Sequence, residues 1–167
     1  MKRRWMLYIT AGATFGIFDF YYHAVLSNIL LPHQDSLAGR LAWGILSTGV
    51  WLIPVIPVVL HETKASRSAW LSALAAAVTW TAAVIFYYLN NAVQLAFIGV
   101  ASRPEMHISN RADPHFWDNW RNVLIYTLLV DNIIWLVVAV VGGFAVGYAL
   151  SVLYLRSAAG KSQASRT

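Results

Sequence analysis

The sequence contains no cysteine among its 167 residues, and only 11% of its residues are charged. Without cysteine the chain has no disulfide, no thiolate metal ligand, no iron–sulfur cluster and no cysteine nucleophile. Soluble domains carry charge on about 25% of their residues, so this composition is not that of a soluble domain. Hydrophobic residues make up 59% of the chain and form long runs, as in membrane-spanning helices.

A nucleic-acid-binding surface is also absent from the pattern. The net charge is +5, but the basic residues stand at the ends of the apolar runs and form no patch interleaved with aromatic residues. Membrane topology and anionic lipid headgroups explain this distribution. We therefore expect the lipid bilayer, and no nucleic acid, as a partner of this chain.

The apolar runs predict four membrane-spanning helices. The predicted helices cover residues 5–31, 38–60, 69–100 and 122–155. Each is long enough to cross about 30 Å of hydrocarbon. We also expect a short interfacial helix at 114–121, with Asp113 as its N-cap, and a disordered tail at 156–167. Short connections between neighbours make the fold class all-α, an integral membrane four-helix antiparallel bundle in a single domain, 1–167.

The distribution of Lys and Arg predicts the orientation. Of the twelve, eight fall on one side of the predicted bundle: Lys2, Arg3, Arg4, Lys64, Arg67, Arg156, Lys161 and Arg166. Cytoplasmic loops carry the excess of Lys and Arg. We therefore expect a multi-pass protein of the cytoplasmic (inner) membrane, with its N- and C-termini in the cytoplasm.

Two ionisable residues interrupt the first apolar run, Asp19 and, one helical turn later, His23. They share a helix face with Gly12, Gly16 and Ser27. Small residues let another helix approach closely, so this face is predicted to form a helix–helix seam. Ionisable groups inside the membrane are costly and usually functional, although a buried pair that only fixes helix register is the alternative.

Polar residues also interrupt the third and fourth predicted helices. They are Asn90, Asn91, Gln94, Asp131 and Asn132. A rise of ~1.5 Å per residue places them and the Asp19–His23 pair at similar depths, ~9–18 Å below the outer helix ends. This shared depth predicts one buried polar site that opens to the extracytoplasmic side and binds a metal ion or a small ligand.

Asp, His, Asn and Gln side chains without cysteine suit copper, zinc or iron. Asp19 and His23 would be two ligands of a divalent metal, and His33 would have to fold back from the outer mouth as the third. Haem is not expected, because no second intramembrane histidine is placed as a trans axial ligand.

The pattern Asp19-x-x-x-His23 followed by Pro32-His33 resembles a metal-binding stretch in the membrane C subunit of particulate methane and ammonia monooxygenases. In that family an Asp, a His one turn later and a further His are copper ligands. The resemblance implies these roles for Asp19, His23 and His33. It covers about fifteen residues, and the His-to-His gap here is shorter than in the family.

Other polar and aromatic residues have simpler interpretations. His61 and Glu62 are expected to form a solvated helix end, and HETK lacks the second His of a zinc-protease motif. Five tryptophans near predicted helix ends are expected to form an interfacial aromatic belt: Trp5, Trp43, Trp70, Trp117 and Trp120.

Three functions remain open from the sequence. The first is a four-helix protein with a buried site for a metal or small ligand. The second is a non-catalytic subunit or assembly factor of a larger membrane complex, and the third is a proton- or ion-coupled carrier that acts as a homo-oligomer. The residues define no reaction, so the sequence does not decide whether the protein is an enzyme.

Overall fold

The computed structural model describes residues 2–30, 33, 35–98 and 112–164. The side chains at positions 124, 127, 128, 131 and 161–164 are outside this description. Glu105 and His107, which fall between the third and fourth predicted helices, therefore lie outside the described residues, as does the side chain of Asp131.

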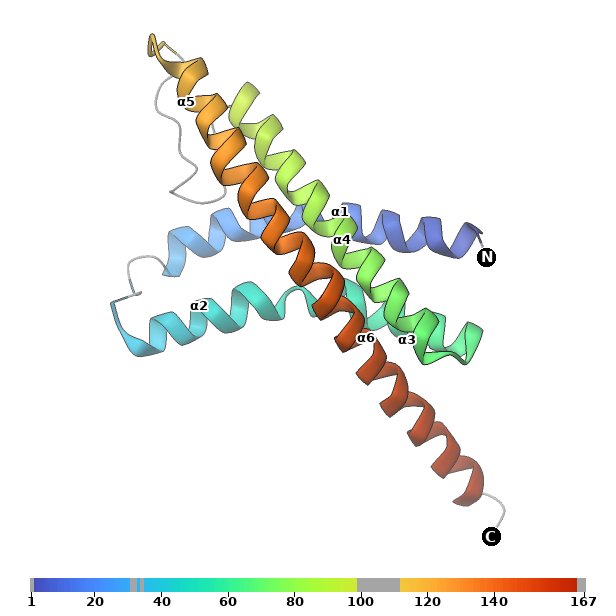
Figure 1. Cartoon of the computed structure of the whole chain (residues 1–167). Helices are drawn as coiled ribbons and strands as arrows, with labels where there is room; N and C mark the ends of the chain where they lie inside the picture. The colour runs from blue at the N-terminus through green and yellow to red at the C-terminus, as the bar shows by residue number, and fades with distance from the viewer. Residues whose placement is uncertain (1, 31–32, 34, 99–111, 165–167) are drawn as a thin grey trace.

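The described chain is helical and forms a packed bundle (Figure 1). Its elements, in order, are α1 (Lys2–Leu30), α2 (Leu37–Gly49), α3 (Leu52–Ser66), α4 (Ala69–Phe97), α5 (Phe116–Asn122), the π-helix η3 (Val123–Val130) and α6 (Asp131–Ala164). The pair formed by α1 and α2–α3 crosses the pair formed by α4 and α6. Both chain ends lie at the end of the bundle where α3 turns into α4 (Figure 1).

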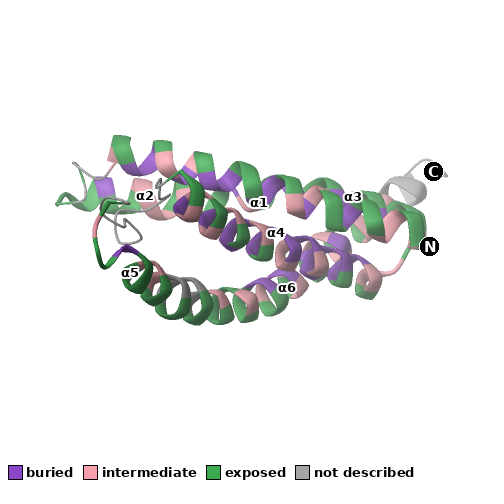
Figure 2. Cartoon of the chain, turned by 90° about the horizontal axis from the view of Figure 1, so that it is seen from above, coloured by how far each residue is buried: buried purple, intermediate pink, exposed green. Residues whose placement is uncertain are grey.

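Helix α4 is the centre of the bundle (Figure 2). Half of its most apolar stretch is buried, against 28% for α2–α3 and 17% for α6. Small residues allow this central position. Gly12 and Gly16 of α1 lie so close to α4 that a Cβ on Gly12 would overlap the Thr79 carbonyl oxygen and a Cβ on Gly16 would overlap that of Ala83. The predicted seam along α1 is therefore confirmed, and its partner is α4.

A second small-residue seam joins α6 to the other side of α4. A Cβ on Gly143 would lie 3.0 Å from Ala77 Cα, and one on Gly147 would lie 2.9 Å from Ala73 Cα. Helices surrounded by lipid associate through close backbone packing, because the hydrophobic effect provides no driving force between them. Because α4 is alanine-rich and α1 and α6 bring glycines to it, both contacts form along its length.

The second predicted helix is broken into α2 and α3 at Val50 and Trp51. Pro54 has no backbone N–H to donate to Val50 four residues earlier, and the Val50 carbonyl accepts from Ile53 instead, at 3.0 Å. The sequence predicted one continuous helix over residues 38–60, and the structure shows an interruption there.

Helix ends differ from the prediction in two other places. Helix α6 continues to Ala164, so residues 156–164 are helical and the expected disordered tail was wrong there. Helix α5 begins at Phe116 without a side-chain cap, whereas Asp113 Oδ1 accepts from the backbone N–H of His115 at 2.7 Å. Asp113 therefore closes a turn ahead of the helix instead of capping it.

Three helices are long and apolar enough to span a membrane: α2–α3 taken together, α4 and α6. These are three of the four predicted spans. Helix α1 has the same length as α4, 29 residues, but the cations at its start and the polar residues within it lower its hydropathy.

Candidate functional site

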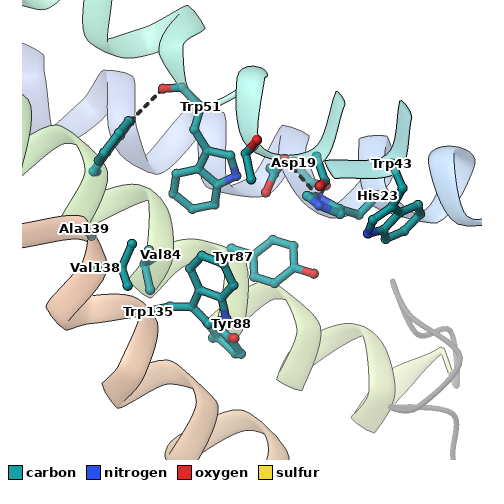
Figure 3. A pocket seen from close by; sticks show the side chains of 13 residues that line it. Asp19, His23, Trp43, Trp51, Val84, Tyr87, Tyr88, Trp135, Val138 and Ala139 are labelled. Atoms are coloured by element: carbon teal, nitrogen blue, oxygen red, sulfur yellow. Dashed lines mark hydrogen bonds and ion pairs between the residues drawn. The ribbon is translucent and has the colours of Figure 1, made fainter. Parts of the chain in front are cut away.

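The bundle contains a partly open pocket of about 380 Å³ between α1, α2, the α2–α3 break, α4 and α6 (Figure 3). Its lining is mainly aromatic and aliphatic, with a few polar side chains. The lining residues are Asp19, His23, Trp43, Ser47, Thr48, Trp51, Trp80, Val84, Tyr87, Tyr88, Trp135, Val138 and Ala139. Its volume and its few polar groups among apolar walls are those of small-molecule sites.

Asp19 and His23 form the polar side of this pocket. Both are buried, with 0% and 4% of their surface exposed. His23 Nδ1 donates to the backbone carbonyl oxygen of Asp19 at 3.1 Å and lies 3.1 Å from Asp19 Oδ1. Nδ1 carries one hydrogen at most, and the hydrogen bond to the carbonyl uses it, so neither carboxylate oxygen has a hydrogen-bond donor among the described residues.

The break between α2 and α3 builds the opposite wall. The carbonyl oxygen of Trp51, at this break, accepts a 2.6 Å hydrogen bond from Trp80 Nε1 of α4. The Trp51 and Trp80 rings meet edge to face, with centroids 6.4 Å apart. Edge-to-face contacts and a satisfied indole N–H hold these two large side chains in place. This hydrogen bond and ring contact join the α2–α3 break to α4 at the pocket wall.

Aromatic rings also surround the His23 imidazole. Its ring centroid lies 5.8 Å from that of Tyr87 and 6.3 Å from that of Trp43. Figure 3 shows Asp19 and His23 on the α1 side of the pocket and Trp135, Val138 and Ala139 on the α6 side. The polar pair thus faces an apolar, aromatic chamber.

The other predicted site residues whose side chains are described lie outside this lining. Asn91 Nδ2 donates to the Tyr87 carbonyl oxygen at 2.9 Å, and Gln94 Nε2 donates to the Tyr21 hydroxyl at 2.9 Å. Asn90 Nδ2 and Asn132 Oδ1 are buried without a hydrogen-bond partner among the described residues. Of the predicted layer, the described structure brings only Asp19 and His23 to the pocket.

The predicted metal ligands are not assembled as a set. His33 is exposed beyond the end of α1. Over the described residues, no three His, Asp or Glu side chains come close enough together to bind one metal ion. Asp19 and His23 could therefore supply two ligands, and the predicted third is apart from them.

Sequence reasoning missed the aromatic walls. Trp43 was assigned to the interfacial belt, yet it lines the pocket together with Trp51, Trp80 and Trp135. The sequence did contain a signal for these walls. Tryptophan favours the membrane interface, yet Trp80 and Trp135 fall within apolar helices, and such a position suggests a packing or binding role.

A second buried polar cluster joins α1 to the end of α3. The Tyr8 hydroxyl donates to Glu62 Oε2 at 2.6 Å and lies 2.9 Å from His61 Nδ1. Arg4 approaches the same carboxylate at 3.3 Å. Glu62 is only 1% exposed, so its prediction as part of a solvated helix end was wrong. The reason is tertiary, because Tyr8 and Arg4 of α1 cover it.

No protein-family model, curated protein or solved structure matches this chain. The resemblance of Asp19, His23 and His33 to a monooxygenase subunit therefore stays a prediction from a short stretch. The fold and the site define a class: a small helical protein with three helices able to span a membrane, and with polar residues buried among them.

Proposed function

We propose that this protein spans the membrane four times and binds a small, largely apolar ligand in the pocket beside Asp19. One observation carries the proposal. A pocket of about 380 Å³ among the helices holds a carboxylate whose two oxygens are buried and have no hydrogen-bond donor among the described residues. A buried, unsatisfied carboxylate is expensive, and such groups in membrane helices usually serve function. A bound ligand would supply the missing interactions.

The pocket belongs to the half of the bundle that we assign to the extracytoplasmic side. Both chain ends and the α3–α4 turn lie at one end of the bundle (Figure 1). That end carries most of the described cations, including Arg4, Lys64 and Arg67. The positive-inside rule makes it cytoplasmic. Asp19 and His23 lie in the other half of α1, so the pocket would be nearer the outer surface.

Cysteine labelling tests this orientation in a chain that has no cysteine of its own. Asp35 and Ala65 are exposed at opposite ends of the bundle. In intact cells, Asp35→Cys should react with a membrane-impermeant maleimide, and Ala65→Cys should react only after the membrane is permeabilised. Labelling of Ala65→Cys alone in intact cells would reverse the orientation, and equal labelling of both would contradict a four-span topology.

Photolabelling tests the pocket itself. The probe 3-trifluoromethyl-3-phenyldiazirine is small, apolar and neutral. We expect it to label buried lining residues such as Tyr87 and Tyr88, besides exposed residues such as Ile133. Ala139→Phe should fill the pocket and remove most of the label from the lining, by about tenfold, because Ala139 is 3% exposed and lines the cavity. Peptide mass mapping gives both readings on one sample.

Val140→Phe is the matched control for this substitution. It places the same side chain one position further along α6, where Val140 is 49% exposed. The pocket label should persist in that variant, and the label on Ile133 should persist in both. Labelling confined to exposed residues in the wild-type protein would mean that the pocket takes up no small apolar molecule.

A copper, zinc or iron ion is the second candidate occupant. The close approach of Asp19 to His23 favours it, since the pair offers an oxygen and a nitrogen ligand on adjacent helical turns. It predicts about one equivalent of metal in purified protein by elemental analysis, and loss of that metal in His33→Ala. We rank it second because the described residues bring together two of the three predicted ligands.

A further inference from the structure

The ligand class follows from the charge of the pocket lining. This step rests on the proposed binding function. Among the described lining residues there is no Lys, Arg or Glu, and Asp19 is the acidic side chain. The other polar groups are one imidazole and a few hydroxyls. We propose that the pocket selects an organic cation, such as a quaternary ammonium or phosphonium ion with apolar substituents.

An anion would meet the Asp19 carboxylate with no Lys or Arg among the described lining residues to attract it. A neutral apolar molecule would leave both carboxylate oxygens as they are, buried and without a donor. Burying a charge is costly unless it is paired and hydrogen-bonded, and His23, whose Nδ1 lies 3.1 Å from Asp19 Oδ1, donates no hydrogen bond to that carboxylate. A ligand that brings a positive charge therefore gains most from this site.

Four indoles and two phenols around the acid favour an organic over an inorganic cation. Trp51, Trp80 and Trp135 are among the lining residues, and aromatic faces attract cations, tryptophan most strongly. A small inorganic ion loses its water shell only if several oxygen or nitrogen ligands replace it. An alkylated ammonium spreads its charge over apolar surface and gives up its hydration more easily, so aromatic and aliphatic walls suit it.

Two sources could supply this chemistry, a free amphiphilic cation or the headgroup of a choline lipid. The headgroup carries a phosphate next to its ammonium, and that phosphate would enter the neighbourhood of Asp19. A free cation has no such group. The shared requirement is the quaternary ammonium itself.

The test is protection of the purified full chain against the photolabel described above, in dodecyl maltoside. Benzyltrimethylammonium should protect Tyr87 and Tyr88 in the wild-type protein, whereas benzenesulfonate, a similar-sized anion, should not. Neither measurement needs a variant. No protection by benzyltrimethylammonium, or equal protection by benzenesulfonate, would overturn the cation inference. The proposed function would then still stand, because it requires only that the probe label the pocket.

Asp19→Asn separates charge from shape. We expect at least a tenfold rise in the benzyltrimethylammonium concentration that gives half protection. The half-protecting concentration of neopentylbenzene, its neutral isostere, should change by less than threefold. Each ligand is compared with itself across the two proteins. Gel filtration checks that the variant is folded. An equal shift for both ligands, or none for the cation, contradicts charge recognition. Dodecylphosphocholine identifies the source: protection at a lower concentration than benzyltrimethylammonium indicates a lipid headgroup.

Discussion

Gly16→Leu is expected to separate α1 from α4 and to lower the free energy of unfolding by about 3 kcal/mol. A Cβ at this position would overlap the Ala83 carbonyl oxygen and lie 2.9 Å from the Tyr87 backbone nitrogen. These are backbone atoms of the central helix, so no side-chain rotation relieves the overlap. Inserting carbon into a close-packed contact costs about 1–3 kcal/mol and occasionally more.

The consequence should reach the pocket, because Asp19 lies one turn after Gly16 on the same face of α1. Denaturation in sodium dodecyl sulfate followed by circular dichroism measures the stability, and the photolabel pattern reports the pocket. Gly44→Leu is the matched control, since a Cβ there meets no atom within 4 Å. Gly44→Leu should be neutral or slightly stabilising, because glycine is a poor helix former. Equal stability of the two variants would contradict the seam.

Tyr8→Phe is expected to be the other large effect, although it removes one oxygen atom. Tyr8 and Glu62 are 0% and 1% exposed. The hydroxyl gives the carboxylate its 2.6 Å hydrogen bond, whereas Arg4 approaches no closer than 3.3 Å from a half-exposed position. Hydrogen bonds to charged groups contribute about 1.5–3 kcal/mol, and a buried acceptor left without its donor loses that much. We therefore expect about 2–3 kcal/mol of destabilisation.

A double substitution distinguishes this reason from a general loss of packing. Tyr8→Phe with Glu62→Leu removes both the donor and the charge, and replacing a buried polar pair by apolar groups is often nearly neutral. The double variant should therefore be more stable than Tyr8→Phe alone. Tyr148→Phe, at a side chain 42% exposed, is the control and should change the stability little. A double variant less stable than either single one would show that the carboxylate itself is needed.

The seams and the pocket could be predicted from the sequence to different degrees. Gly12 and Gly16 were read correctly as a contact face, because glycine spacing on a helix follows from its geometry alone. Asp19 and His23 were assigned to one site for the same reason, being one turn apart. The polar residues of the third and fourth predicted helices were grouped with them by depth. The depth of a residue in the membrane does not determine the direction in which its side chain points. Asn91 donates to the Tyr87 carbonyl oxygen and Gln94 to the Tyr21 hydroxyl.

By itself, the sequence determined what depends on composition and on periodicity along one helix. These are the all-α class, the apolar lengths of α2–α3, α4 and α6, and the pairing of Asp19 with His23. Only the tertiary structure decided what depends on contact between helices. It placed α4 at the centre, turned Trp43 and Trp135 into one pocket and buried Glu62 under Tyr8. The physical reason is that helix rotation and partner choice are set by how side chains from distant segments fit together, and no single helix contains that information.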